Sequence, residues 1–204
     1  DVCSSDLKDI SVKALAKINL GLDVVRKRED GYHEVRMVMQ TIHLFDRLEI
    51  SKNTSGEITM ETNLSFLPTN ENNLVYKAAK LLQDEFAIKD GVHVWLHKYI
   101  PVAAGMAGGS TDAAAVLYGM NQIFDLGLTR EELMERGVKI GADVPYCIMR
   151  GTALAEGIGE KLSKLPPMVK CPVLIAKPQI SVSTKFVYEN LKLGSDMVHP
   201  DIDR

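Results

Sequence analysis

The order in which strand-like and helix-like segments follow one another is the feature that most constrains the fold of this chain. Strand periodicity is found at 10–26, 35–45, 47–52, 57–62 and 92–100, and further short strands are expected within 151–165 and, buried, at 173–176. Helical spacing is found at 72–86, 111–124, 129–140 and 183–191. Because strands and helices come in runs and do not alternate strictly, the sequence predicts an α+β layered fold and disfavours a doubly wound sheet.

Local signals support several of these segments. Asn72 is a suitable N-cap for the first helix, and Thr129 with Glu132 forms a capping box at the third. Soft or weakly polar side chains that lie in apolar surroundings are expected in the core, namely Met37, Met39, Cys147 and Met149.

The composition limits the classes of function that remain. With 24 Lys and Arg against 27 Asp and Glu, the net charge is -3, and the absence of a sustained basic run argues against a nucleic-acid partner. No apolar stretch approaches the roughly 18 residues of a membrane span. The three cysteines are far apart and odd in number, and the histidines lack metal-ligand spacing. We therefore expect no disulfide framework, no metal site held by side chains, no membrane partner and a cytoplasmic location.

A run of small residues from Pro101 to Asp112 stands between a predicted strand and a long Ala-rich helix. Small side chains let backbone N–H groups approach a ligand, and the free N–H groups and dipole of a helix N-terminus attract anions. The run therefore indicates a phosphate site, to which Ser110 and Thr111 add hydroxyl donors. It has neither the lysine of a Walker A loop nor the glycine spacing of a dinucleotide fingerprint. From these residues alone, a flexible loop whose glycines only permit tight helix packing remains the alternative.

The same run resembles the central motif of the GHMP kinases, which include galactokinase and the homoserine, mevalonate and phosphomevalonate kinases. The matching residues are Pro101-x-x-x-Gly105-x-x-Gly108-Gly109-Ser110-Thr111-Asp112-Ala113-Ala114-Ala115, with Met106 and Thr111 where Leu and Ser are usual. Three more segments are similar to those of kinases acting on 4-diphosphocytidyl-2-C-methyl-D-erythritol, namely Ala16-Lys17-Ile18-Asn19-Leu20, Asp30-Gly31-Tyr32-His33 and Gly141-Ala142-Asp143-Val144-Pro145. The resemblance runs from about Ile10 to Leu191.

The resemblance implies an architecture of two domains. Residues 10–165 are expected to form a GHMP-kinase-like two-layer domain (ribosomal protein S5 domain 2-like) that binds ATP and carries the catalytic residues. Residues 166–204 are expected to begin a ferredoxin-like C-terminal domain, and residues 1–9 to be a disordered or non-native lead. Because family members are longer and have a later glycine-rich motif that this sequence lacks, the chain is expected to be truncated at its C-terminal end.

ATP, accompanied by Mg²⁺, is the phosphoryl donor that the resemblance implies. The residues expected to hold its phosphates are Pro101, Ala104, Gly105, Ala107, Gly108, Gly109, Ser110 and Thr111. Asn73 is a candidate for adenosine binding, and a helix-cap role is the alternative.

By the same resemblance, Asp143 is the general base and Lys17 is its electrostatic partner. A base in phosphoryl transfer orients the attacking hydroxyl and accepts its proton late, while an ammonium group helps to hold the transferring phosphoryl. From the residues alone, an Asp between small residues and a proline is also typical of a cap or turn. A lysine in an apolar strand is likewise typical of a surface position.

Four residues are candidates for binding a small cytidine diphosphate substrate. Asn19 lies one pleat repeat from Lys17, on the same face of its strand, where its amide can bond hydroxyl groups. The resemblance implies that Tyr32 stacks on the cytosine and that His33 bonds the edge of the base. Tyr188 is the position expected for the second side of a cytosine sandwich, and a core aromatic is the alternative there.

The resemblance therefore predicts ATP-dependent phosphorylation of the 2-hydroxyl of 4-diphosphocytidyl-2-C-methyl-D-erythritol, a step of non-mevalonate isoprenoid biosynthesis. The alternatives are another GHMP small-molecule kinase and a nucleotide-binding fragment without turnover. The sequence gives no indication of the oligomeric state.

Overall fold

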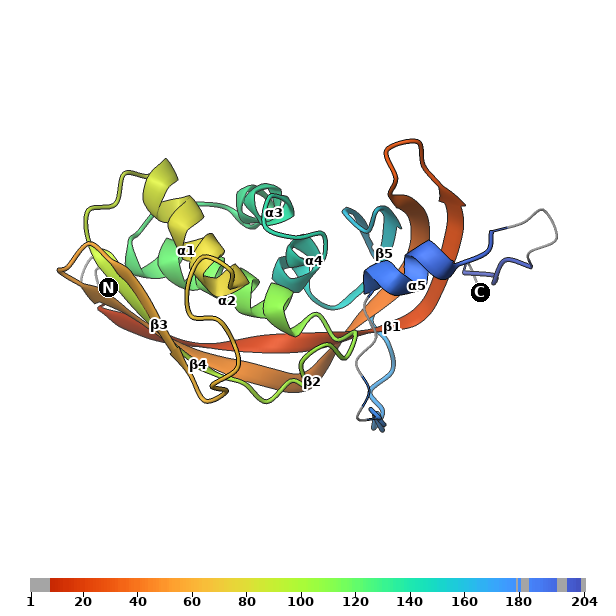
Figure 1. Ribbon diagram of the computed structural model, residues 1–204, viewed down its shortest axis with the longest axis horizontal. Coiled ribbons are helices and arrows are strands. Elements are labelled where there is room, and N and C mark those ends of the chain that lie inside the picture. The colour runs from red at the N-terminus through yellow and green to blue at the C-terminus, as the bar shows by residue number, and fades with distance from the viewer. Residues whose placement is uncertain (1–7, 179, 181–183, 194–197, 203–204) are drawn as a thin grey trace.

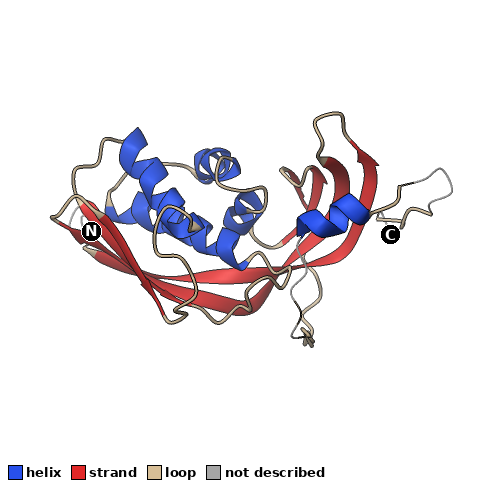
Figure 2. Ribbon diagram, in the orientation of Figure 1, coloured by secondary structure: helices blue, strands red, loops and turns tan. Residues whose placement is uncertain are grey.

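A six-stranded sheet forms one layer of the molecule, and α1, α2, α3 and α4 lie together on one face of it (Figures 1 and 2). The computed structural model describes residues 8–178, 180, 184–193 and 198–202; the expected lead up to residue 7 and Ser183 of the last predicted helix lie outside them. The strands are β1 (Asp9–Lys27), β2 (His33–Asn53), β3 (Ile58–Thr62), β4 (Gly91–His97), β5 (Thr152–Gly157) and β6 (Lys161–Lys164). The helices are α1 (Leu74–Glu85), α2 (Gly108–Ile123), α3 (Arg130–Val138), α4 (Val144–Met149) and α5 (Thr184–Asn190).

β2 is the strand on which the rest of the sheet is built. β1 pairs antiparallel with it from one end to the other, at the cost of three register shifts. The opposite edge of β2 is shared, because residues 35–40 pair with β5 and residues 47–53 pair with β4. β3 extends the sheet beyond β4 in parallel, and β6 extends it beyond β5. Residues 41–46 of β2 therefore face a gap in which β4 and β5 diverge.

Loops satisfy the polar groups on both sides of this gap. The N–H of Thr41 donates to the carbonyl of Gly151, just before β5, at 3.0 Å. The carboxylate of Asp46 accepts the N–H of Ile100, just after β4, at 2.8 Å. The chain that follows Ile100 leaves the sheet at the gap, so the glycine-rich run begins beside the middle of β2.

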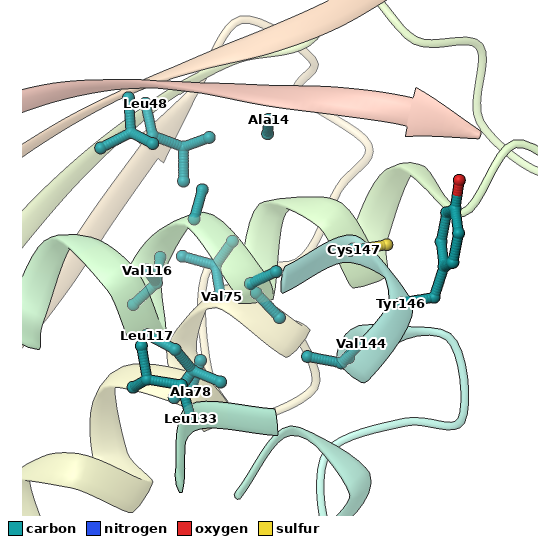
Figure 3. Packing of buried hydrophobic residues seen from close by; sticks show 14 of the residues in the cluster. Ala14, Leu48, Val75, Ala78, Val116, Leu117, Leu133, Val144, Tyr146 and Cys147 are labelled. Carbon is teal, nitrogen blue, oxygen red and sulfur yellow. The ribbon is translucent and has the colours of Figure 1, made fainter. Parts of the chain in front are cut away.

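The core lies between the sheet and the helices, and α2 is its centre. Figure 3 shows Leu48 and Ala14 of the strands above Val116 of α2 and Val75 of α1. The Ala-rich composition of α2 allows its backbone to approach the sheet closely. At Gly119 the approach is so close that a Cβ would overlap Cδ1 of Ile50 in β2.

The structure corrects three predictions of the strand and helix pattern. Residues 35–45 and 47–52 form one continuous strand, because the buried Asp46 between them is hydrogen-bonded within the fold and does not break it. α4 was not predicted, since its six residues are too short to show a helical period. The expected buried strand at 173–176 is wrong: residues 165–178 form neither helix nor strand, and Leu174 is 98% exposed.

The helix starts were predicted with mixed success. The capping box of Thr129 and Glu132 is present at α3, with both reciprocal hydrogen bonds. The N-cap of α1 is Asn73 and not Asn72. α2 begins at Gly108, three residues before the predicted Thr111. Among the helices of the described residues, none combines the length and the hydropathy that crossing a membrane requires.

Replacing Gly119 tests the close contact between α2 and β2. Gly119→Ala is expected to lower the free energy of unfolding by about 1–3 kcal/mol, because the added methyl overpacks a filled site. Ile50→Val, which removes the opposing Cδ1, costs about 0.5–1.5 kcal/mol alone. In the double variant the two losses should be far less than additive, as measured by urea unfolding. Additive losses would contradict the contact.

Candidate active site

A cleft of about 680 Å³ opens beside the gap in β2, where β1, the end of β4 and the N-termini of α2 and α4 meet. Residues from distant parts of the chain line it. Those that the sequence analysis singled out are Lys17, Asn19, Asn73, Pro101, Ala104, Gly105, Ala107, Gly108, Gly109, Ser110, Asp143 and Tyr188. Three predicted site residues are not in this lining, namely Thr111, Tyr32 and His33.

The glycine-rich loop has an unusual backbone conformation. Three alternate residues are left-handed: Ala103 at φ 53°, Gly105 at φ 71° and Ala107 at φ 54°. A non-glycine residue in this region costs about 1–2 kcal/mol, so surrounding contacts must impose the conformation. One such contact is the backbone N–H of Lys17 in β1, which donates to the carbonyl of Met106 at 3.2 Å. Alternation of this kind turns backbone N–H groups into a concavity suited to an anion.

The N-terminus of α2 continues this concavity. Its N-cap residue, Ala107, has no side chain that can cap the helix. The first intrahelical bond shown runs from the N–H of Thr111 to the carbonyl of Ala107 at 2.8 Å. The N–H groups of the three residues 108–110 precede that bond, and all three residues line the cleft. The loop and helix therefore present main-chain donors and the positive end of a helix dipole to one space.

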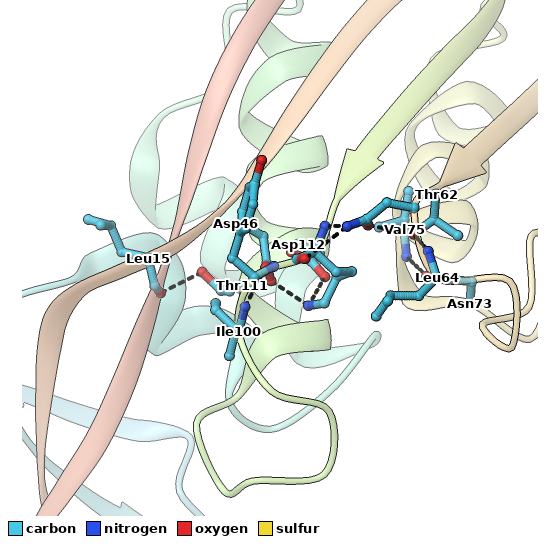
Figure 4. Close-up of polar contacts among 12 residues, drawn as sticks. Leu15, Asp46, Thr62, Leu64, Asn73, Val75, Ile100, Thr111 and Asp112 are labelled. Atoms are coloured by element: carbon cyan, nitrogen blue, oxygen red, sulfur yellow. Dashed lines mark hydrogen bonds and ion pairs between the residues drawn. The ribbon is translucent and has the colours of Figure 1, made fainter. Parts of the chain in front are cut away.

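Thr111 does not contribute to this anion site as predicted. Its hydroxyl donates to the carbonyl of Leu15 in β1 at 2.8 Å, and the residue is only 3% exposed (Figure 4). Its backbone N–H is used by the carbonyl of Ala107. The prediction of a phosphate-binding hydroxyl at Thr111 is therefore corrected: the side chain fastens α2 to β1.

Lys17 and Asp143 meet across the cleft. A register shift in β1 falls between Leu15 and Lys17. A local irregularity of this kind can re-aim a side chain, and Lys17 faces the cleft. The ammonium of Lys17, on a side chain 7% exposed, donates to the amide oxygen of Asn19 at 3.1 Å and lies 3.7 Å from Oδ2 of Asp143. The predicted shared face of Lys17 and Asn19 is therefore present.

Asp143 occupies the N-cap position of α4, yet its side chain makes no cap hydrogen bond. The carboxylate is 32% exposed and faces the cleft. α4 itself is held by Tyr146, whose hydroxyl donates to the carbonyl of Gly151 at 2.6 Å and lies 3.0 Å from the hydroxyl of Thr41. Burial raises the pKa of Tyr146 to about 12, so this donor stays protonated. The gap in β2 thus also positions Asp143.

Asn73 lines the cleft, but its side chain caps α1. Its amide oxygen accepts the N–H of Val75 at 3.0 Å, and its amide nitrogen donates to the carbonyl of Pro68 at 2.8 Å. Of the two alternatives that the sequence left open, the cap is the role seen in the structure.

Tyr188 lines the cleft and contacts a second aromatic side chain, that of His33. The ring of Tyr188 on α5 lies 4.9 Å from the ring of His33 at the start of β2, with 34° between their planes. Burial, together with the carboxylate of Asp143, raises the pKa of Tyr188. Tyr32 is 60% exposed, and its backbone N–H donates to the side chain of Asp30 at 3.1 Å. The structure therefore brings Tyr188 to His33 and leaves Tyr32 outside the lining.

Two charged residues at the cleft, Lys98 and Asp112, were not predicted from the sequence as parts of the site. Lys98, directly after β4, is buried and contacts the carboxylates of Asp46 and Asp112. Asp112 belongs to the glycine-rich motif, but no role was assigned to it. The signal available in the sequence was the occurrence of Asp46 and Lys98 within otherwise apolar strand segments, where an unpaired charge is very costly.

Comparisons with known proteins agree with this geometry. A family profile described as the GHMP kinases N terminal domain matches residues 73–151. The 4-diphosphocytidyl-2-C-methyl-D-erythritol kinase of Lachnoclostridium phytofermentans is 62% identical over 194 residues, which cover 95% of this chain and 67% of that protein. The protein of the same description from Lachnospira eligens is 59% identical over 197 residues, or 97% of this chain and 68% of its own length.

Solved structures show the same similarity. A crystal structure of 4-(cytidine 5'-diphospho)-2C-methyl-D-erythritol kinase superposes with a TM-score of 0.76 at 34% identity, over 90% of this chain and 65% of that one. Homoserine kinase from Cytophaga hutchinsonii superposes with a TM-score of 0.67 at 19% identity, over 92% of this chain and 61% of that one, and shows the fold alone.

The fold is therefore the α+β N-terminal fold of the GHMP kinases, as predicted. Within that class, the chain belongs to the family of 4-diphosphocytidyl-2-C-methyl-D-erythritol kinases. It spans about two thirds of the length of the relatives that it matches.

The left-handed conformation of Ala107 is open to a stability test. Ala107→Gly removes about 1–2 kcal/mol of strain and adds about 0.4–1 kcal/mol of unfolded-state entropy, so a net gain of about 0.5 kcal/mol is expected. Ala114→Gly, inside α2, is the matched control and should lose about 1 kcal/mol or more. Urea unfolding measures both. If Ala107→Gly lost as much as the control, the conformation assigned to the loop would be wrong.

Proposed function

We propose that the protein carrying this chain transfers the terminal phosphoryl group of ATP to the 2-hydroxyl of 4-diphosphocytidyl-2-C-methyl-D-erythritol. The observation that carries the proposal is the distance of 3.7 Å between the amine of Lys17 and the carboxylate of Asp143, within the cleft that the glycine-rich loop lines. Family membership and the described activity of a relative that is 62% identical support the choice of substrate.

The glycine-rich loop and the first turn of α2 are the proposed site of the ATP phosphates. The residues assigned to it are Pro101, Ala104, Gly105, Ala107, Gly108, Gly109 and Ser110, without Thr111. Main-chain N–H groups suit this task because they are fixed in direction and need no reorganisation during transfer. The ammonium of Lys17 adds a positive charge on the opposite wall.

Asp143 is the proposed general base. It accepts the proton of the 2-hydroxyl as that oxygen bonds to the terminal phosphorus, while the bond from phosphorus to the bridging oxygen breaks and ADP leaves. The transition state is loose, so proton transfer comes late, and orientation of the hydroxyl is the main contribution. Lys17 holds the carboxylate by charge and is itself positioned by Asn19.

Mg²⁺ is expected to arrive with ATP, because it usually keeps several waters and is held by substrate phosphates with one or two carboxylates. Within the described residues, no cluster of three or more His, Cys, Asp and Glu side chains is suited to a metal ion. The two described carboxylates of the cleft are engaged, Asp143 near Lys17 and Asp112 with Lys98. These side chains do not fit a resident metal ion, and we assign no step to one.

The part of the cleft around Tyr188 is proposed to receive the cytosine. Tyr188 is half-buried there and lies against His33, so a base can stack on one ring while the imidazole bonds its edge. Base–aromatic stacking is worth about 1–3 kcal/mol. Tyr32 keeps its proposed place as a ring that stacks on the cytosine, with Tyr188 on the second side; its 60% exposure leaves the ring of Tyr32 accessible to a ligand.

The proposed domain division follows the sheet. The proposed ATP-binding and catalytic domain is residues 10–165. Its boundary is placed there because β6, the last strand of the sheet in chain order, ends at Lys164. Residues 166–204 begin the second domain, which we propose to be ferredoxin-like.

Asp143→Asn tests the base. It is expected to lower kcat by about 10²–10⁴-fold, because the amide cannot accept the proton. Affinity for ATP and the unfolding midpoint should stay close to wild type, since the carboxylate makes no cap bond and asparagine is a good N-cap. Asp125→Asn, an exposed loop position, is the matched control.

Steady-state kinetics of the full-length protein and calorimetric titration with ATP provide these measurements. A variant with normal turnover would refute the assigned base, and one that fails to fold would show that Asp143 is a structural cap. Phosphorylation of homoserine or mevalonate in place of the cytidine substrate would assign the protein to another GHMP activity. Binding of ATP without any product from wild type would favour the nucleotide-binding alternative.

A further inference from the structure

Three charged side chains are buried together beneath the N-terminus of α2. The ammonium of Lys98 contacts the carboxylate of Asp46 in β2 and lies 2.8 Å from Oδ2 of Asp112 in α2. The side chains of Lys98, Asp46 and Asp112 are 4%, 0% and 3% exposed. We call these three residues the buried triad; Figure 4 shows two of its members, Asp46 and Asp112, close together.

The buried triad holds both ends of the glycine-rich loop. Where the loop begins, the second oxygen of Asp46 accepts the N–H groups of Tyr99 and Ile100 at 2.5 and 2.8 Å. Where it ends, the amine of Lys98 lies so close to Gly108 that a Cβ there would stand 3.0 Å from it. A change of charge or geometry in the buried triad is therefore transmitted to the loop directly.

The charges of the buried triad do not balance if both carboxyl groups are ionised, because one ammonium then faces two carboxylates. Oδ1 of Asp112 is buried and has no hydrogen-bond partner among the described residues, while Asp112 itself lines the cleft. A net negative charge at this position lies beneath a surface built to receive phosphate. Burial raises the pKa of Asp112 to about 8; Lys98 opposes this rise, and Asp46 adds to it.

Among the described residues, few titratable or charged groups face Asp112 from the surrounding elements. β2 contributes Asp46, and the residue after β4 is Lys98. α4 contributes the thiol of Cys147, whose pKa burial raises to about 12, so that it stays neutral. Lys17 of β1 and Asp143 lie across the cleft as a pair of opposite charges. α1 contributes the apolar Leu74 beside Gly109. Protonation of one triad carboxyl is thus the way in which the buried charges balance.

We propose that the buried triad positions the glycine-rich loop and that Asp112 couples nucleotide binding to a proton, with ATP bound tightly when the Asp112 carboxyl is neutral and weakly when it is ionised. This inference rests on the proposed role of the loop as the phosphate site. It makes Asp112 a positioning residue, which acts through Lys98 and the loop and by charge beneath the phosphates.

The sign of the effect follows from linkage. Below about pH 8 Asp112 is neutral, and the buried triad carries no net charge. As the pH rises through that value, the carboxyl ionises, its charge repels the polyphosphate, and affinity falls. Binding at alkaline pH must then take up a proton. The phosphates do not cause such a change, because their last ionisation lies near pH 6.

Calorimetric titration of the full-length protein with MgATP between pH 7 and 9.5 tests the proposal. We expect Kd to rise about tenfold or more; the ceiling is roughly thirtyfold, since about one molecule in thirty stays neutral 1.5 units above the pKa. Titrations at pH 9 in two buffers of different ionisation enthalpy should show uptake of up to about one proton per ATP. A flat profile with no uptake would overturn the inference.

Two isosteric variants form the matched comparison. Asp112→Asn imitates the neutral carboxyl, so its Kd should stay within about twofold of wild type at pH 7 and no longer rise with pH. Asp143→Asn changes the other cleft carboxylate and should keep the rise. Loss of the rise in Asp143→Asn, or its persistence in Asp112→Asn, would assign the proton elsewhere.

A second variant covers the case in which Asp112→Asn does not fold. Asp46→Asn leaves one carboxylate for one ammonium, so it should also remove the rise of Kd with pH. Persistence of the rise in Asp46→Asn would contradict the charge balance. If wild type bound no ATP at pH 7, the proposed function would be wrong. If wild type bound ATP with a Kd that does not depend on pH, only the inference about the buried triad would be wrong.

Discussion

The shared edge of β2 is the constraint on which the cleft depends. Because β1 occupies one edge of β2 throughout, β4 and β5 must divide the other, and they part over residues 41–46. Buried backbone N–H and C=O groups of β2 at this gap have no neighbouring strand to pair with. They must be hydrogen-bonded by the segments that follow β4 and precede β5. Here the glycine-rich loop leaves β4 and α4 leads into β5, so both are brought to the same stretch of β2. A cleft at a point where strand neighbours diverge is also the rule in open α/β sheets.

The charged contacts of the cleft join elements that are far apart in the chain. Lys17 links β1 to the start of α4 through Asp143, and Lys98 links β2 to α2 through two carboxylates. Buried ion pairs are a poor source of net stability, because desolvation offsets most of their attraction. Their consequence here is geometric: removal of one partner leaves an uncompensated charge, so the correct arrangement of loop and helices is strongly favoured over alternatives.

Local signals in the sequence were sufficient wherever the structure is decided within a few residues. The capping box at Thr129 formed as predicted, since both of its partners belong to one helical turn. The run after Pro101 was also recognised as a loop that leads into a helix N-terminus, because its small residues and the helix that follows them are adjacent in the chain. The role of a side chain was predicted wrongly where its hydrogen-bond partner belongs to another helix or strand. Thr111 has the hydroxyl of a phosphate ligand, but β1 supplies a closer acceptor in the carbonyl of Leu15.

The sequence by itself determined the class of layers, the position of the glycine-rich loop and the identity of the family, since each depends on periodicity or on residues close together in the chain. Only the tertiary structure decided that Asp46 continues a strand, that Lys17 faces the cleft beside a register shift, and that Asp112 has an oxygen without a hydrogen-bond partner among the described residues. The physical reason is that periodicity reports which residues avoid water. Periodicity does not show which buried polar groups from separate elements contact one another. Those contacts determine the charge beneath the loop.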